Sequence, residues 1–301
     1  MPATQRQFLD NGLKLLDQKP NLHIIIDWED SLKNSDTKSE MRNKDLGRKT
    51  TAEYAHDFKK YLHRVWVRIN GIHTRYFADD LQTMFYLKCQ IDGVVLPKAE
   101  DAEAVQELQQ YFNVIPLIES QKGFANRENL MASNVQFVRF GPQDYFFEKQ
   151  VFPLPQSPHV SALFDTVIDD FLITAEQHDT VFVCPIFNNL KLEENFLKAH
   201  RYIFQKLHKT RIGVTVLTPT QLEWIEKLQN QNWHTIQANH QSYTLKELET
   251  LAQLIISAHE KRENHDLSVS HLRESGHYVT PYQYIAAKKF LDQIRNDQEA
   301  F

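Results

Sequence analysis

The sequence predicts an α/β fold of the (β/α)8 (TIM) barrel class, with the first strand missing or truncated and extra C-terminal helices. Three observations lead to this prediction. Seven short runs of apolar and β-branched residues recur along the chain. Segments with helical spacing of apolar residues lie between most of these runs. A length of 301 residues is ordinary for one barrel of this kind.

The predicted strands are apolar almost throughout and do not alternate with polar residues. This pattern is typical of parallel strands that helices cover on both faces. The runs are 22–28, 64–70, 93–98, 113–119, 135–141, 180–186 and 212–218.

The predicted helices alternate with the strands and then continue alone, as expected for βαβ units followed by a helical end. They span 78–90, 100–111, 161–177, 192–208, 219–230, 244–261 and 280–296. Thr244 and Glu247 have the spacing of a capping box, and Pro281 suits the first turn of the last helix. Segment 262–279 is polar and His-rich, which indicates a loop or a short hairpin.

A closed barrel needs eight strands, and the sequence offers seven candidates. The chain runs from Met1 almost directly into a helical pattern, so we expect the first strand to be absent or cut short. Either the natural start lies upstream or the barrel is gapped. We expect residues 1–230 to form the barrel and residues 231–301 a helical extension, which packs on the barrel or on a neighbouring subunit.

Composition excludes several classes of protein. The net charge of −5 gives no support for a nucleic-acid-binding protein, which usually carries a basic stripe. No apolar run is long enough to span a membrane. The N-terminal residues contain no apolar signal core, so we expect a cytoplasmic protein. Cys89 and Cys184 form neither a disulfide framework nor a metal-binding spacing, and we expect two ordinary buried thiols.

Charged residues follow several predicted strands at their carboxyl ends, where barrel enzymes form their active sites. Glu119 and Asp144 are separated by one strand–helix unit, which predicts neighbouring strands. Two close carboxylates need a cation or a proton between them, and hard oxygen ligands favour Mg²⁺. Arg68 can hold a substrate carboxylate through both arms of its guanidinium. The candidate residues are Asp27, Glu29, Asp30, Arg68, Lys98, Glu119 and Asp144.

Each candidate also has a purely structural alternative. Asp27 can cap the turn that follows it, while Glu29 and Asp30 are merely solvated. Arg68 can be an ion-pair partner, and Lys98 can simply cover the barrel rim. The joint placement at strand ends favours a functional site more than any single residue does.

Five segments together resemble the HpcH/HpaI aldolase and citrate lyase β-subunit family. They are IIIDWEDSL (24–32), WVRIN (66–70), DGVVLPKAE (92–100), VIPLIESQKGFANREN (114–129) and FVRFGPQD (137–144). The likeness is strong over residues 22–144 and looser towards the end of the chain.

The resemblance implies roles for these residues. Glu119 and Asp144 bind Mg²⁺, and Arg68 binds the carboxylate of the keto-acid half of the substrate. Asp27, Glu29 and Asp30 line the metal site as catalytic residues. Gly141, Pro142 and Lys98 contribute to substrate binding. Family members make or break a bond between an acetyl-CoA-like enolate and an α-keto acid such as oxaloacetate or glyoxylate, usually as trimers or hexamers.

The resemblance therefore implies a Mg²⁺-dependent carbon–carbon lyase that acts on a hydroxy-acyl-CoA such as citryl-CoA or malyl-CoA. A CoA-independent aldolase of a hydroxy-keto acid and a divergent, non-catalytic barrel subunit are the alternatives. The chain departs from the family pattern in Asp-Trp-Glu-Asp-Ser at 27–31 and in Leu217-Thr218-Pro219, where the family has Ile-His-Pro. The sequence does not identify the general base.

Overall fold

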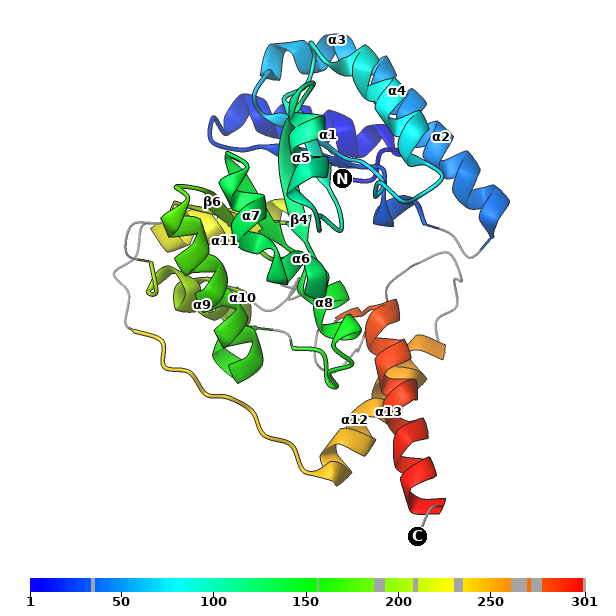
Figure 1. Ribbon diagram of the computed structural model, residues 1–301, viewed down its shortest axis with the longest axis vertical. Helices are drawn as coiled ribbons and strands as arrows, with labels where there is room; N and C mark the ends of the chain where they lie inside the picture. Colours follow the sequence, from blue (N-terminus) through cyan, green and yellow to red (C-terminus); the bar gives the residue numbers. More distant parts are fainter. Residues whose placement is uncertain are drawn as a thin grey trace. The chain divides into compact units, whose positions relative to one another are not determined.

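The protein forms two compact units, and Figure 1 labels their helices and some of their strands. The structure is a computed structural model that describes residues 1–33, 36–155, 157–186, 193–207, 211–229, 235–260, 270–271 and 278–299. The first unit comprises Met1–Ile118 and Lys122–Arg139, and the second comprises Glu119–Gln121 and Phe140–Phe301. The domain boundary expected between residues 230 and 231 stays a prediction, because 230–234 lie outside the described residues.

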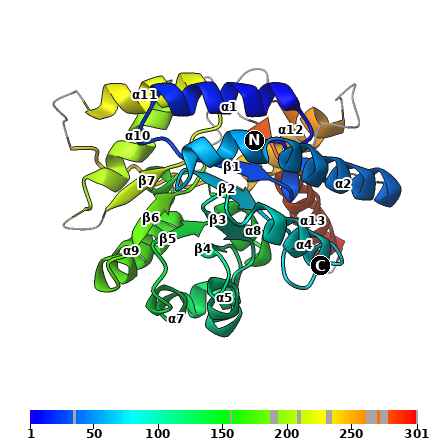
Figure 2. The same cartoon turned by 90° about the horizontal axis from the view of Figure 1, so that it is seen from above.

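The first unit alternates strands and helices. In Figure 2 its strands lie next to one another, with α1, α2, α4 and α5 around their outer side. The strands are β1 (Ile24–Asp27), β2 (Val65–Arg68), β3 (Gly93–Leu96), β4 (Asn113–Ile118) and β5 (Phe137–Phe140), of which Phe140 belongs to the second unit. The helices are α1 (Arg6–Gln18), α2 (Thr37–Glu53), α3 (Ala55–Phe58), α4 (Phe77–Leu87), α5 (Ala102–Gln109), α6 (Gln121–Ala125) and α7 (Arg127–Ala132). Two 3-10 turns, η1 (Asp30–Leu32) and η2 (Lys59–Tyr61), complete it.

The strands of this unit pair in parallel, β1 with β2, β2 with β3 and β3 with β4. Trp66, Val95, Ile115 and Leu117 form a buried cluster on these strands. Asp27 and Arg68 are the last residues of β1 and β2 and are direct partners in the register. Parallel pairing therefore places an acid and a base side by side at the carboxyl end of the strands, about 5 Å apart along the hydrogen-bonding direction.

Helix α2 has no counterpart among the expected helices, although it is 17 residues long. The face that it buries is mostly polar, with Lys44, Arg48 and Thr51 among its buried residues. A pattern search that follows apolar residues at helical spacing does not recognise such a helix. The partners of these polar groups are described with the candidate site.

The second unit begins with α8 (Pro142–Glu148), η3 (Pro158–Val160) and α9 (Ala162–Gln177). Strands β6 (Val181–Cys184) and β7 (Ile212–Val214) pair in parallel. The remaining elements are α10 (Glu193–Phe204), α11 (Pro219–Gln229), α12 (Leu245–Glu260), β8 (Ser270–His271), β9 (Tyr278–Val279) and α13 (Pro281–Glu299). The described part of segment 262–279 is a short antiparallel pair of β8 with β9.

Two apolar clusters organise the second unit. The first is a set of buried aromatic rings in which the ring of Phe140 contacts those of Tyr145, Phe146, Phe164 and Phe171. The second lies between α12, β9 and α13, and its buried members are Ala252, Ile255, Val279 and Ala287. Helices α8 and α9 thus contribute to the first cluster, and α12 and α13 to the second.

The caps expected at two helices are confirmed. The backbone N–H of Thr244 donates to Glu247 Oε2 at 2.8 Å, and the N–H of Glu247 donates to Thr244 Oγ1 at 3.3 Å. Helix α13 begins at Pro281. Cys184 is buried as expected, but Cys89 is exposed, which corrects the expectation of two buried thiols. None of the helices in the described part of the chain is both long and apolar enough to cross a membrane.

The expected (β/α)8 barrel with a missing first strand is wrong. Each of the seven expected runs does contain a strand, but the described strands follow one another from β1 to β7 and the order does not return to β1. Closure requires continuous pairing around eight strands. Apart from β2, the described residues pair with β1 through a single isolated bridge, Pro2 to Asp27, with the N–H of Asp27 donating to Met1 O at 2.8 Å. The fold is therefore an α/β fold with a seven-stranded sheet.

Gly93 provides a test of the β3–β4 register. A Cβ at this position would lie 2.1 Å from the carbonyl oxygen of Asn113, its partner on β4. We expect Gly93→Ala to lower the free energy of unfolding by about 2 kcal/mol or more, because the contact is with backbone. Gly71→Ala is the control, since the nearest atom to its Cβ would be 3.9 Å away. Urea unfolding of both variants measures the difference, and equal stabilities would contradict the register.

Candidate functional site

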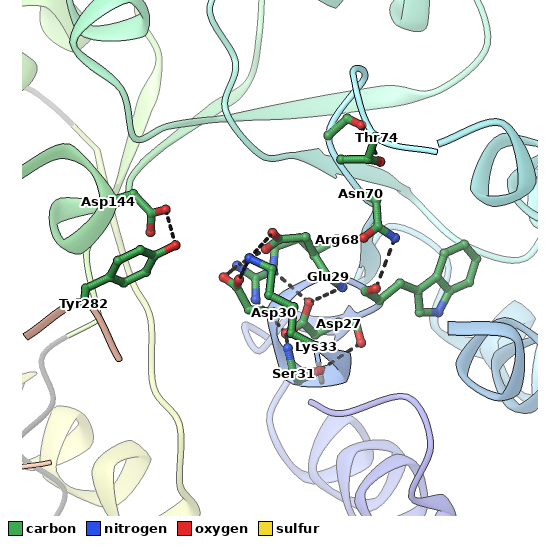
Figure 3. A network of polar contacts seen from close by, with 12 residues as sticks. Asp27, Glu29, Asp30, Ser31, Lys33, Arg68, Asn70, Thr74, Asp144 and Tyr282 are labelled. Carbon is green, nitrogen blue, oxygen red and sulfur yellow. Dashed lines mark hydrogen bonds and ion pairs between the residues drawn. The ribbon is translucent and has the colours of Figure 1, made fainter. Parts of the chain in front are cut away.

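Arg68 and Asp27 form a two-armed ion pair at the ends of β2 and β1 (Figure 3). Arg68 Nε donates to Asp27 Oδ1 at 2.8 Å, and Nη2 donates to Oδ2 at 2.6 Å. The same carboxylate accepts the backbone N–H groups of Glu29 at 2.9 Å and Ser31 at 3.0 Å. Asp27 therefore caps the turn that follows β1 and also fixes the plane of the guanidinium.

Two further carboxylates approach the other arm of the guanidinium. Arg68 Nη1 donates to Asp30 Oδ2 at 2.9 Å and lies 3.1 Å from Glu29 Oε2. The Glu29 oxygen is buried and has no partner with hydrogen-bond geometry in the described part of the chain. Lys33 Nζ pairs with Asp30 at 2.5 Å and with Glu29 at 3.1 Å. The Asp30 side chain is 40% exposed against 12% for Asp27, so the Asp30 side of the guanidinium faces solvent.

The three carboxylates respond differently to the same surroundings. For Asp27 burial alone would raise the pKa, but the charge and hydrogen bonds of Arg68 outweigh it and lower the pKa. Burial, with the neighbouring charge of Asp30, raises the pKa of Glu29 to about 7 against the pull of Arg68. For Asp30, burial is again outweighed by Arg68 and Lys33, which lower the pKa. Of the three carboxyls, Glu29 is therefore the one whose pKa is raised towards neutral pH.

A fully buried lysine, Lys44, binds the backbone of the turn that follows β1. The Lys44 ammonium donates to the carbonyl oxygens of Trp28 at 2.8 Å and Glu29 at 2.7 Å, and to Asn70 Oδ1 at 2.7 Å. Its side chain is 0% exposed, and burial lowers the pKa of Lys44. These three bonds tie α2 to the segment that carries Glu29.

The polar network continues through α4. The backbone N–H and the side-chain amide of Asn70 both donate to Asp80 Oδ2 at 2.7 Å. Asp80 Oδ1 accepts from Arg48 Nη1 at 2.6 Å. Asp80 is 0% exposed, so its charge is balanced inside the unit. Sequence reasoning missed Lys44, Arg48 and Asp80, because each lies within a helical stretch where charged residues are usually solvated.

A second group of candidate residues lies together in the second unit. Glu119 is 6% exposed, and its carboxylate rests against the backbone of Gly141. A Cβ at Gly141 would come within 2.6 Å of Glu119 Oε2. Asp144 is in the first turn of α8, three residues beyond Gly141, and Pro142 is the first residue of that helix. The backbone N–H of Gln121 donates to Glu148 Oε2 at 2.9 Å, which ties the Glu119 segment to the far end of the same helix.

Asp144 also contacts the C-terminal part of the chain. The hydroxyl of Tyr282, on α13, donates to Asp144 Oδ1 at 2.7 Å (Figure 3). The two residues are 138 positions apart in the sequence, and no local signal could have linked them. Lys98, the remaining expected substrate-binding residue, is exposed and has a left-handed backbone with φ 49°.

The donor set of the second unit fits a magnesium ion. Glu119 and Asp144 supply carboxylate oxygens, and the missing side chain at Gly141 leaves the Glu119 carboxylate room at that position. Protein sites for Mg²⁺ commonly use one or two carboxylates and complete the octahedron with water and substrate oxygens. The described residues contain no group of three or more His, Cys, Asp or Glu side chains that could hold a metal by themselves.

The fold and the acidic groups at its strand ends define an α/β protein with a candidate hard-cation site. The family model for HpcH/HpaI aldolase/citrate lyase matches residues 23–205, more than half of the chain. This chain belongs to the HpcH/HpaI aldolase/citrate lyase family. The family resemblance expected from the sequence is therefore confirmed.

One curated relative is the citrate lyase subunit beta-like protein of Deinococcus radiodurans. It is 36% identical over 89 residues, which are 27% of this chain and 30% of that protein. The alignment thus spans under a third of the relative's length.

Solved structures share the fold at low identity. The citrate lyase beta subunit of M. tuberculosis complexed with oxaloacetate and magnesium matches with TM-score 0.55 and 20% identity, over 68% of this chain and 86% of that chain. CitE from M. tuberculosis in complex with magnesium, acetoacetate and coenzyme A matches with TM-score 0.56 and 18% identity, over 90% and 88%. RipC from Yersinia pestis matches with TM-score 0.54 and 19% identity, over 68% and 86%. Magnesium, the cofactor expected from the sequence, is the ion named with the first two structures.

The Lys44 contacts predict a large cost for removing its charge. Lys44→Met leaves two carbonyl oxygens and the Asn70 amide without their buried donor, and we expect a loss of about 3 kcal/mol of unfolding free energy. The control is Lys49→Met on the same helix, where the lysine is exposed. Chemical denaturation of both variants makes the comparison. A Lys44 variant as stable as the control would show that the network does not hold the turn.

The proton on Glu29 predicts a pH-dependent stability. The pKa of Glu29 is about 7 in the folded protein, against an ordinary value of 4.5 in the unfolded chain. The stability that the protonated Glu29 carboxyl contributes is therefore fully present below pH 4.5 and is lost as the pH rises through 7. We expect the free energy of unfolding of Glu29→Gln, relative to the wild type, to rise between pH 5 and pH 8 by an amount on the order of 2 kcal/mol. Glu107→Gln, at an exposed position of α5, is the control for replacing a glutamate by glutamine. Urea unfolding across this range tests it, and a flat Glu29→Gln difference would refute the proton assignment.

Proposed function

We propose that this chain is a Mg²⁺-dependent carbon–carbon lyase, which cleaves a hydroxy-acyl-CoA of the citryl-CoA or malyl-CoA type into an acetyl-CoA-type product and an α-keto acid. One observation carries the proposal: the Glu119 carboxylate rests on Gly141, three residues before Asp144 in the first turn of α8. Membership of the aldolase and citrate lyase family supports it. So do the ligands named with the solved structures of the same fold.

In this proposal Glu119 and Asp144 hold the ion. Bound Mg²⁺ would supply a Lewis acid and a template for the substrate oxygens. The absence of a side chain at Gly141 allows the Glu119 carboxylate to occupy its position, because a Cβ there would clash with it. Gly141 and Pro142 would bind substrate at the start of α8, and Lys98 would also contribute to substrate binding.

Arg68 would bind the carboxylate of the keto-acid half. Its Nε and Nη2 are held by Asp27, whereas its Nη1 pairs with the more exposed Asp30. A substrate carboxylate would therefore replace Asp30 at Nη1 and leave the Asp27 pair intact. The exchange of one carboxylate for another keeps the guanidinium neutralised.

Cleavage requires a base for the substrate hydroxyl. When the hydroxyl loses its proton, its oxygen becomes the keto-acid carbonyl, the carbon–carbon bond breaks and the electron pair passes to the enolate of the other product. Glu29 is the candidate base, because its pKa of about 7 suits proton exchange at neutral pH. Asp27 and Asp30 would act through Arg68, as its orienting and exchangeable partners.

The proposal predicts that Glu119→Gln and Asp144→Asn each lose Mg²⁺ binding and at least 100-fold in turnover, because each removes a charged oxygen ligand. Isothermal titration with Mg²⁺ measures binding. Mass spectrometry of reactions with citryl-CoA, malyl-CoA and a CoA-free hydroxy-keto acid measures turnover. Glu176→Gln, at an exposed position of α9, is the control for the loss of one negative charge away from the candidate ligands.

The substrate panel separates the alternatives. Mg²⁺-dependent release of oxaloacetate or glyoxylate from a thioester supports the proposal. Pyruvate released only from CoA-free substrates identifies an aldolase that does not use CoA. Metal binding without turnover of any substrate identifies a non-catalytic subunit. A wild-type protein that does not bind Mg²⁺ rules the proposal out.

A further inference from the structure

The contact between Tyr282 and Asp144 joins the C-terminal helix to a proposed metal ligand. The Tyr282 hydroxyl donates to Asp144 Oδ1 at 2.7 Å, and the contact is partly buried (Figure 3). Asp144 lies in the first turn of α8, and Tyr282 is the second residue of α13. The hydrogen bond therefore acts on one carboxylate within the second unit.

The start of α13 is fixed by its own cap. The backbone N–H of Thr280 donates to Gln283 Oε1 at 2.8 Å, and the N–H of Gln283 donates to Thr280 Oγ1 at 3.3 Å. Both residues are buried, at 6% and 9% exposed. This reciprocal capping box sets where the first turn of α13 begins, and so it sets the position of Tyr282.

Contacts to aromatic rings hold α13 against α8 and the segment that follows α8, without help from the hydroxyl. The rings of Phe147 and Tyr282 are 5.1 Å apart, and the Lys289 ammonium lies 5.1 Å from the Phe147 ring. Phe152 and Phe290 stack with ring centres 4.6 Å apart. Removing the hydroxyl alone would leave this packing in place, so its role can be measured separately.

We propose that Tyr282 is a positioning residue of the Mg²⁺ site, whose hydroxyl holds the Asp144 carboxylate in the orientation that receives the ion. The inference rests on the proposed function, because Asp144 must be a ligand. A hydroxyl that donates to a carboxylate favours the ionised form and restricts its rotamers. An ionised carboxylate has about four lone-pair positions, so it can accept this hydrogen bond and still bind a cation. Hydrogen bonds to metal ligands typically change metal affinity by about 10- to 100-fold.

The test compares two hydroxyl deletions on one helix in the full chain. We expect Tyr282→Phe to bind Mg²⁺ and Mn²⁺ about 10-fold more weakly than the wild type, with an altered Mn²⁺ electron paramagnetic resonance spectrum. Tyr284→Phe is the matched control. Its hydroxyl donates to Glu260 Oε1 at 3.2 Å, away from the candidate ligands, and it should bind within about two-fold of the wild type. Isothermal titration gives the affinities, and thermal unfolding gives the stability of each variant.

The outcomes separate this inference from the proposed function. If the wild type does not bind Mg²⁺, or if Asp144→Asn binds it normally, both proposals fail. If Asp144→Asn loses the ion but Tyr282→Phe keeps full affinity, only the role of Tyr282 fails, whatever its melting temperature. Equal weakening in Tyr282→Phe and Tyr284→Phe would assign the effect to helix stability and overturn the inference. Mg²⁺ binding about 10-fold weaker in Tyr282→Phe, with Tyr284→Phe within about two-fold of the wild type, supports the inference.

Discussion

The ion pair between Asp27 and Arg68 is the constraint on which the group of carboxylates at the end of β1 depends. The register of β1 and β2 makes these residues neighbours, and the two-armed geometry fixes the guanidinium plane. A buried guanidinium is what allows Glu29 and Asp30 to lie beside Asp27, because three carboxylates would otherwise repel one another. Three carboxylates against Arg68 and Lys33 leave one negative charge in excess, and burial raises the pKa of Glu29 to about 7.

The turn that follows β1 is also held by a buried ammonium, which donates to neutral oxygen acceptors. Lys44 binds two backbone carbonyls and Asn70, and Asn70 in turn binds Asp80. A buried ammonium is costly unless its donors are satisfied, and here three oxygens at 2.7 to 2.8 Å satisfy them. Rigid support of this kind is what a group needs if its charge must change without its position changing.

In the first unit an ion pair holds the candidate residues in place, whereas in the second unit the Glu119 carboxylate packs closely against Gly141. Glu119 can rest on the chain at Gly141 only because that residue has no side chain. The Tyr282 hydroxyl then adds a contact from far along the sequence to Asp144. The solved structures of this fold, at 18 to 20% identity, establish the architecture and leave the chemistry of this chain to its own residues.

The sequence by itself determined the positions of the strands, most of the long helices and the family, because buried parallel strands and helix caps leave local patterns and the five motif segments are contiguous. It also indicated that Asp27, Glu29, Asp30 and Arg68 follow strand ends. Tertiary structure decided that α2 is a helix with a polar buried face, that the strand order stays open, and that Tyr282 contacts Asp144. Those features depend on partners distant in the chain, and a one-dimensional pattern carries no record of such pairing.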